Sequence, residues 1–381
     1  MLINDLSHQI RWFWLTLTLG VCFALPHPLL GLQFEWDYSL DESGYFSGGL
    51  GPSKRAALEA AASVWEELIV DEIEAIQPLS GRGYYDIYGL HPESGEVTRL
   101  ERNPSIAANT LRIYVGSQSM SAQTLAKGGP GGYAYGGSWR NQRAQLVTNI
   151  TRGESGITRT GSTRELGEKS DFAPWGGVIT FNADFEDFHW NHRLKVPSDK
   201  IDFFSTCLHE LGHVLGIGTS ETWQQYVSGA FFQGPNALEA FARAGGQGDI
   251  PLTTDQSHWS YRVQSQDLAG EKIMVPLMFA SASDGLRNQV TQLDAMVLKD
   301  IGWEIAFGQM PAPQPVTLAL TRELERIVLS VPSEPGHLYT LKSSNDFRQW
   351  IVSGEQSGDG QALEWRFPIR EAHRFWRVEV R

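Results

Sequence analysis

Cysteine is scarce in this chain, whose 381 residues include only Cys22 and Cys207. Cys22 lies in an apolar N-terminal stretch, so Cys207 would be the single cysteine of a processed chain. One cysteine cannot form an internal disulfide, which excludes a disulfide-stapled scaffold. We expect Cys207 to be a small, buried apolar residue, and stability to come from packing, size and a bound ion.

Positive charge is also scarce. Lysine and arginine together number 31, against 44 aspartates and glutamates, which gives a formal net charge of −13. A surface of this sign repels phosphate backbones and anionic lipids, so we expect no nucleic-acid partner. Protein or peptide ligands are compatible with it. The sequence carries no pattern that reports the oligomeric state.

Long uncharged apolar stretches are confined to the N-terminus. Residues 12–25 carry no charge and follow Arg11, a pattern typical of a signal peptide. The stretch is shorter than the roughly 20 residues of a transmembrane helix, although an uncleaved anchor is the alternative. We therefore predict a signal peptide over residues 1–31, cleaved between Pro26 and Leu32, and a secreted protein.

One short motif predicts metal chemistry. In His209-Glu210-Leu211-Gly212-His213 the two histidines stand four residues apart, so a helix would present both on one face. Catalytic zinc favours such nitrogen ligands and keeps one position open for water. Glu210 can accept a proton from that water and pass it to a leaving group. The motif thus predicts Zn²⁺ bound by His209 and His213, with Glu210 as general base and then acid.

The residues around the motif predict that it lies on a buried helix. Leucines and valines surround it on several sides, at Leu208, Leu211, Val214 and Leu215. Ser198 or Asp199 is the expected N-cap, and Gly216 and Gly218 are expected to end the helix in left-handed conformations. A buried helix without a metal is the alternative, but two histidines and a glutamate would be poor core residues.

The third ligand must lie outside the motif. The short pattern HExxHxxGxxH has its third histidine where this chain has Thr219, and threonine is a poor zinc ligand beside two imidazoles. His258, far downstream, is the leading candidate. Glu239 and Asp255 are the alternatives that the residues leave open.

Beyond the motif, the chain from Phe231 to Met278 resembles leishmanolysin-like and matrixin-like metzincins, a family of secreted metallopeptidases. These enzymes insert a segment between the glycine, here Gly216, and the third histidine. The resemblance rests on Phe232-Gln233-Gly234-Pro235-Asn236-Ala237, His258-Trp259 and Ile273-Met274-Val275-Pro276. It implies that His258 is the third ligand and that Met274 forms a supporting turn beneath the metal. Met278 competes with Met274 for that role.

The resemblance also implies an architecture. It predicts an α+β catalytic domain with a twisted sheet, long helices and an active-site helix, closed by a helix over Thr291–Ile301 with Asp294 in its first turn. The strand over residues 178–182 would lie at the sheet edge and pair with extended substrate. Relatives often place an oxyanion-stabilising tyrosine two residues after the turn methionine. Here that position holds Pro276, and Tyr261 is the alternative hydroxyl.

A glycine-rich run precedes these elements. It comprises Gly128-Gly129-Pro130-Gly131-Gly132 followed by Gly136-Gly137. The run lacks the Gly-Lys-Ser/Thr ending of a phosphate-binding loop, so that function is rejected. We expect a flexible loop near the cleft.

Composition and alternation divide the chain into regions. A proline-rich linker over residues 310–315 separates a catalytic domain over 32–309 from a C-terminal module over 316–381. In the first we predict strands over 33–38, 111–115 and 177–181 and a helix over 52–76. Short alternating runs in the second predict a small all-β sandwich. Attachment to a surface or polymer and a purely stabilising role both fit this module.

Together these patterns favour a secreted zinc endopeptidase that hydrolyses peptide bonds in protein or peptide substrates. The alternative is a non-catalytic extracellular adhesion or polymer-binding protein with a structural zinc site. Such a closed site would need a fourth protein ligand and would make Glu210 superfluous. Hydrolysis of a non-peptide amide fits the motif as well. Substrate preference and activation route leave no pattern in the sequence.

Overall fold

The structure is a computed structural model that describes residues 31–153, 157–158, 171–306, 316–323, 325–333, 338–345, 349–358, 360–369 and 374–380. The predicted signal peptide, except its last residue, and the proline-rich linker lie outside these residues. Within them the protein is a mixed α+β structure with several sheets and few helices, as the sequence predicts at this coarse level. None of the described helices has the length and apolar content needed to cross a membrane.

A four-stranded sheet forms the centre of the region over residues 31–306. Its order is β1-β4-β9-β5, with β1, β4 and β9 parallel and β5 antiparallel at one edge. The strands are β1 (Gln33–Asp37), β4 (Thr110–Gln118), β9 (Gly176–Asn182) and β5 (Ala126–Pro130). β9 is buried along its whole length, as expected for an interior strand that is covered on both faces.

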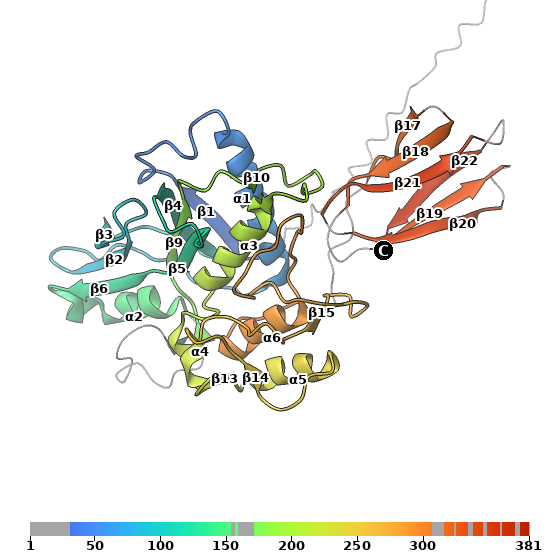
Figure 1. Ribbon diagram of the computed structural model, residues 1–381. Coiled ribbons are helices and arrows are strands. Elements are labelled where there is room, and N and C mark those ends of the chain that lie inside the picture. Colours follow the sequence, from blue (N-terminus) through green and yellow to red (C-terminus); the bar gives the residue numbers. More distant parts are fainter. Residues whose placement is uncertain are drawn as a thin grey trace, which may run out of the picture. The chain divides into compact units, whose positions relative to one another are not determined.

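Two long helices cover one face of this sheet, α1 (Gly51–Leu68) and α3 (Phe203–Val214) (Figure 1). Alternate strand residues such as Ile113 and Ile179 join their apolar faces in the main core. The predicted helix over 52–76 ends at Leu68, earlier than expected. The reason is tertiary, because Val70 donates its N–H to the carbonyl of Glu304 and the chain turns extended there.

A second, smaller core lies on the other face of the sheet. Tyr114 and Val178, which alternate with the residues of the main core, pack here against Tyr85 and Ile150. The covering elements are the sheet β3-β2-β6, with β2 (Tyr84–Leu90), β3 (Val97–Arg102) and β6 (Gly132–Gly136), a 3-10 turn η1 (Trp139–Gln142) and α2 (Arg143–Thr151). The central sheet is therefore sandwiched between two layers.

The rest of this region is made of short elements. They are β7 (Ile157–Thr158), β8 (Asp171–Phe172), β10 (Phe188–His189), β11 (Ile201–Asp202), α4 (Glu221–Gln225), β12 (Val227–Ser228), β13 (Phe231–Phe232), α5 (Pro235–Arg243), β14 (Ile250–Pro251), β15 (Ser265–Gln266), β16 (Ile273–Met274) and α6 (Gln292–Ile301). The helix predicted over 291–301 is confirmed as α6. Thr291 is its N-cap, and the side chains of Thr291 and Asp294 form a capping box.

The C-terminal β region consists of two three-stranded antiparallel sheets that share one core. The first contains β17 (Ala319–Glu323), β18 (Arg326–Val331) and β21 (Leu363–Pro368), and the second β20 (Ile351–Ser357), β19 (Leu338–Ser344) and β22 (Phe375–Val380). Alternate side chains such as Leu329, Tyr339 and Trp365 fill the space between them. These strands agree with the all-β character that the short alternating runs of the sequence predict for this region.

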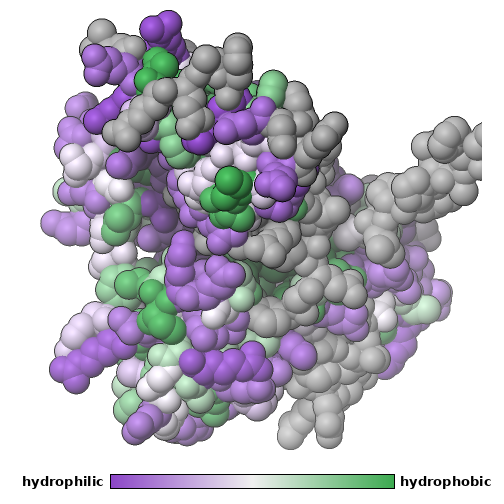
Figure 2. Space-filling model, turned by 90° about the vertical axis from the view of Figure 1, so that its right-hand side faces the viewer, coloured by the Kyte–Doolittle hydropathy of each residue, from purple (hydrophilic) through white to green (hydrophobic). Residues whose placement is uncertain are grey.

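The surface carries little continuous apolar area on the face drawn in Figure 2. Among the coloured residues there, hydrophilic ones predominate and hydrophobic ones form small separate groups. Scattered exposed apolar residues are normal on soluble proteins and mark no docking site by themselves.

Candidate metal centre

Helix α3 carries the motif because its ends and its packing are specified by neighbouring residues. The chain stays extended through β11, which pairs with β10, so the helix begins only after Asp202. The Asp202 side chain accepts the N–H of Ser205 and is the N-cap, which corrects the prediction of Ser198 or Asp199. Gly216 and Gly218 have φ of 102° and 75°, as predicted for the exit of the helix.

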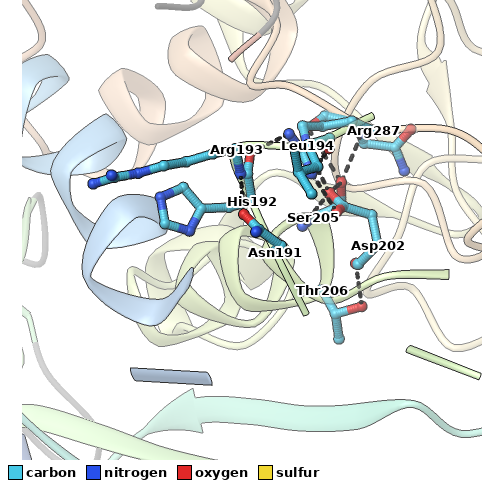
Figure 3. A network of polar contacts seen from close by, with 9 residues as sticks. Asn191, His192, Arg193, Leu194, Asp202, Ser205, Thr206 and Arg287 are labelled. Atoms are coloured by element: carbon cyan, nitrogen blue, oxygen red, sulfur yellow. Dashed lines mark hydrogen bonds and ion pairs between the residues drawn. The ribbon is translucent and has the colours of Figure 1, made fainter. Parts of the chain in front are cut away.

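A buried ion pair fixes the first turn of α3 (Figure 3). The Arg287 guanidinium donates to both carboxylate oxygens of Asp202, at 2.9 and 2.8 Å, and both side chains are almost fully buried. The same guanidinium donates to the carbonyls of His192 and Leu194. The pair therefore joins three separate segments at the start of the helix, a feature that no pattern in the sequence predicts.

The predicted ligands come together in the structure. His209, His213 and His258 have ligand atoms that all lie within 4.8 Å of one another, which is the arrangement needed to hold a metal ion. The Nε2 atoms of His213 and His258 are 3.1 Å apart although the two residues are 45 positions apart. Tetrahedral zinc with bonds of about 2.0–2.1 Å would separate two ligand nitrogens by about 3.3 Å. The distance between this pair is therefore compatible with a shared metal ion.

Each imidazole is oriented by a partner on its other nitrogen. His209 Nδ1 lies 3.0 Å from the carbonyl oxygen of Leu277, and His213 Nδ1 lies 2.8 Å from that of Ile217. A carbonyl can only accept, so these two rings donate through Nδ1 and leave Nε2 free for a metal. His258 Nδ1 lies 3.2 Å from a carboxylate oxygen of Asp255. Asp255, an alternative ligand from the sequence, thus orients His258 instead.

The electrostatics of the histidines favour metal binding. Burial, reinforced by the neighbouring imidazole, lowers the pKa of His209 to about 3 and that of His213 to about 4. Burial also lowers the pKa of His258. Neutral imidazoles are the ligand form, so the site is ready for a cation without first losing protons.

Glu210 lies between the two helix ligands in sequence and is 6% exposed. Burial raises its pKa to about 8, while a hydrogen bond from the Gly128 N–H acts in the opposite direction. A cation held by the neighbouring imidazoles would also favour the carboxylate form. The other glutamate weighed as a ligand, Glu239, is exposed on α5 and pairs with Arg243.

Met278, the alternative to Met274, packs against the motif helix, whereas the role of Met274 as a supporting turn stays a prediction. Met278 is fully buried, and a Cβ on Gly212 of the motif would lie 2.5 Å from its sulfur. Met274 is half-buried in β16, where it pairs with Ser265. Both methionines have apolar neighbours in sequence, so only the tertiary packing distinguishes them. The position two residues after Met278 holds Ala280, which has no hydroxyl either.

Tyr261, the alternative hydroxyl from the sequence, is turned to solvent. Its side chain is among the exposed large apolar ones, at 71%, and its hydroxyl accepts from Arg262 Nε at 2.7 Å. Its role in oxyanion stabilisation therefore has no structural support beyond sequence proximity to His258.

Asp294 connects the segments that carry the ligands. This fully buried carboxylate accepts hydrogen bonds from the backbone N–H groups of Leu277 and Met278, at 2.8 and 3.2 Å, and from Trp259 Nε1 at 3.2 Å. Leu277 in turn accepts from His209, and Trp259 follows His258. The sequence predicts only that Asp294 lies in the first turn of this helix, because the donors that its carboxylate accepts are distant in the chain.

The sheet edge beside α3 is β5 and not the strand predicted for it. Residues 178–182 belong to β9, which is paired on both sides, with β4 and with β5. The glycine-rich run that we expected to be a loop forms β5 and β6 instead. Glycine composition misled the prediction, because some of these glycines, such as Gly128 and Gly131, allow close packing within regular strands.

Comparison of the chain with models of protein families, with curated proteins and with solved structures found no match.

Proposed function

We propose that this protein is a secreted, zinc-dependent endopeptidase of the metzincin type. The observation that carries the proposal is the convergence of His209, His213 and His258, with Glu210 buried next to the first of them. Three neutral imidazoles suit a catalytic zinc, because they leave a fourth position for water or substrate. The proposal of export rests on residues 12–25, which precede the described residues.

The chemistry divides between the ion and the chain. Zinc, when bound, would supply a Lewis acid for the scissile carbonyl and lower the pKa of a water molecule. Glu210 would accept a proton at its carboxylate and return it to the leaving amine. Its position on the same helix as two ligands fixes it relative to them. Leu277, Ile217 and Asp255 hold the rings in place through their Nδ1 atoms.

Strand β5 offers the substrate a backbone to pair with. Two hydrogen bonds flank the β5–β9 ladder: the Asn182 N–H donates to the carbonyl of Leu125, and the Gly131 N–H donates to the carbonyl of Gly176. Because hydrogen-bonded positions alternate along an antiparallel strand, the odd-numbered residues of β5 bond to β9. The backbone groups of Ala126, Gly128 and Pro130 therefore point away from the sheet. An extended peptide can add to this edge with little dependence on its sequence, as expected for an endopeptidase.

Peptide mapping tests the proposal. The full chain, loaded with zinc, is incubated with an unfolded protein mixture, and new peptide termini are identified by mass spectrometry. We expect internal cleavages that disappear in Glu210→Gln, whose rate should fall by at least about 100-fold, the contribution of a general base. Zinc content, measured by atomic emission, should be the same in both.

Glu239→Gln is the matched control, because Glu239 is the exposed glutamate of α5. It should cleave like the wild type. A zinc-loaded, folded wild type that produces no cleavages would contradict the endopeptidase proposal and favour the structural-zinc alternative. Equal cleavage by wild type and Glu210→Gln would contradict the role of Glu210.

A further inference from the structure

The glycine-rich strand β5 lies against the catalytic helix at one particular residue. A Cβ built on Gly128 would lie 2.4 Å from the carbonyl oxygen of Glu210 and 2.9 Å from its Cβ. Both distances are shorter than any real contact of a side-chain carbon. Only glycine therefore allows the strand and the helix to approach this closely.

The backbone of Gly128 also faces Glu210. The ladder alternation directs the N–H of Gly128 away from β9, and its effect on Glu210 is to lower the pKa of the carboxylate, against the larger effect of burial. Pro130, the next outward-facing residue, has no N–H, so Ala126 is the one other outward donor of the strand. The N–H of Gly128 is thus the outward donor of the strand that lies beside the proposed general base.

The neighbouring glycines of the run make no such contact with Glu210. A Cβ on Gly129 would meet nothing within 4 Å. A Cβ on Gly131 would collide with the indole of Trp175, in the core on the other face of the sheet. Among these three glycines, Gly128 is the one that lies against Glu210.

We propose that Gly128 is a positioning residue for Glu210, which it holds by its N–H and by the absence of a side chain. This inference rests on the proposed function and assigns the glycine-rich run a part in it. The same strand that pairs with substrate would then also set the distance between that substrate and the general base. Misplacement by about 1 Å costs on the order of 100-fold in rate when a reacting group must be aligned.

The kinetic test compares Gly128→Ala with Gly129→Ala, which adds the same methyl group to the same strand in open space. In Gly128→Ala the strand must move by about 1 Å to restore contact distances. We expect kcat to fall about 100-fold, with KM changed by less than about threefold. Zinc affinity, measured by chelator competition, should stay at the wild-type value because His209 and His213 orient through other groups. Gly129→Ala should match the wild type throughout. Wild-type kcat in folded Gly128→Ala would overturn the proposal.

A second measurement needs no activity and covers the case in which Gly128→Ala fails to fold. Amide hydrogen exchange is followed by NMR in ¹⁵N-glycine-labelled protein, in the wild type and in Glu210→Ala. The Gly128 amide should exchange at least about tenfold faster in Glu210→Ala, since it loses its acceptor. Gly129, whose amide bonds to β9, should be unchanged. Equal exchange of Gly128 in the two proteins would refute the hydrogen bond even if the protein proves to have no peptidase activity.

Discussion

His209 and His213 reach the candidate metal centre from one buried helix, whereas His258 reaches it from a loop 45 residues later in the chain. The helix ligands are oriented by backbone carbonyls, and their helix is fixed by a buried ion pair. The loop ligand is oriented by Asp255, whose side chain is 57% exposed. A helix encodes its two ligands locally, by spacing alone. The third depends on contacts that form only in the folded chain.

The two sides meet at Asp294. Its carboxylate bonds to the indole that follows His258 and to the backbone beside the His209 acceptor. Buried and hydrogen-bonded by several donors, it makes the geometry of one side depend on the other. Variants of the helix that carries His209 and His213, of the loop that carries His258, and of Asp294, the joint between them, should therefore differ in their effects on stability and zinc affinity.

The largest effect is expected on the helix side, from Arg287→Met. The variant leaves the Asp202 carboxylate buried without its cation, which should cost about 3–5 kcal/mol in the free energy of unfolding. Denaturant unfolding of the metal-free protein measures the loss. The double variant Asp202→Asn with Arg287→Met is the control, because asparagine can still cap α3 and no charge stays unpaired. It should recover at least about 2 kcal/mol, and a double variant as unstable as the single one would contradict the pairing argument.

An intermediate effect is expected at the joint, from Asp294→Asn. An amide has only one acceptor oxygen and cannot accept all the hydrogen bonds that the carboxylate accepts. The free energy of unfolding should therefore fall by about 2–3 kcal/mol. Zinc affinity should fall too, since both His209 and His258 lose support. The control is Asp300→Asn on the same helix, where Asp300 accepts the N–H groups of Asn236 and Ala237 at the start of α5. It should destabilise the fold without changing zinc affinity, and parallel losses in both variants would argue against a joint.

The smallest effect on stability is expected on the loop side, from Asp255→Ala. His258 would keep its place but lose its orienting carboxylate, so zinc affinity should fall about 10- to 100-fold. Chelator competition measures this change, and the thermal midpoint of the metal-free protein should barely move. Asp249→Ala, which removes an exposed carboxylate from the same region, should leave zinc affinity unchanged. Unaltered affinity in Asp255→Ala would show that the loop ligand needs no carboxylate.

Local patterns predicted what depends on neighbours in sequence. The alternation of residues 33–38 predicts β1, and the spacing of His209 and His213 predicts one ligand-bearing face. Patterns misled where a distant partner decides the outcome. The glycines of β5 suggested a loop because composition reports conformational freedom but not close packing.

The sequence by itself determined the mixed α+β character, the ligand helix with its glycine exit and the candidate histidines, because helical periodicity and turn chemistry act over a few residues. Only the tertiary structure decided that Met278 lies beneath Gly212, that Asp255 orients His258 and that β5 is the sheet edge next to Glu210. Each of these is a contact between segments distant in the chain. Such contacts follow from how the layers pack, and no local spacing encodes them.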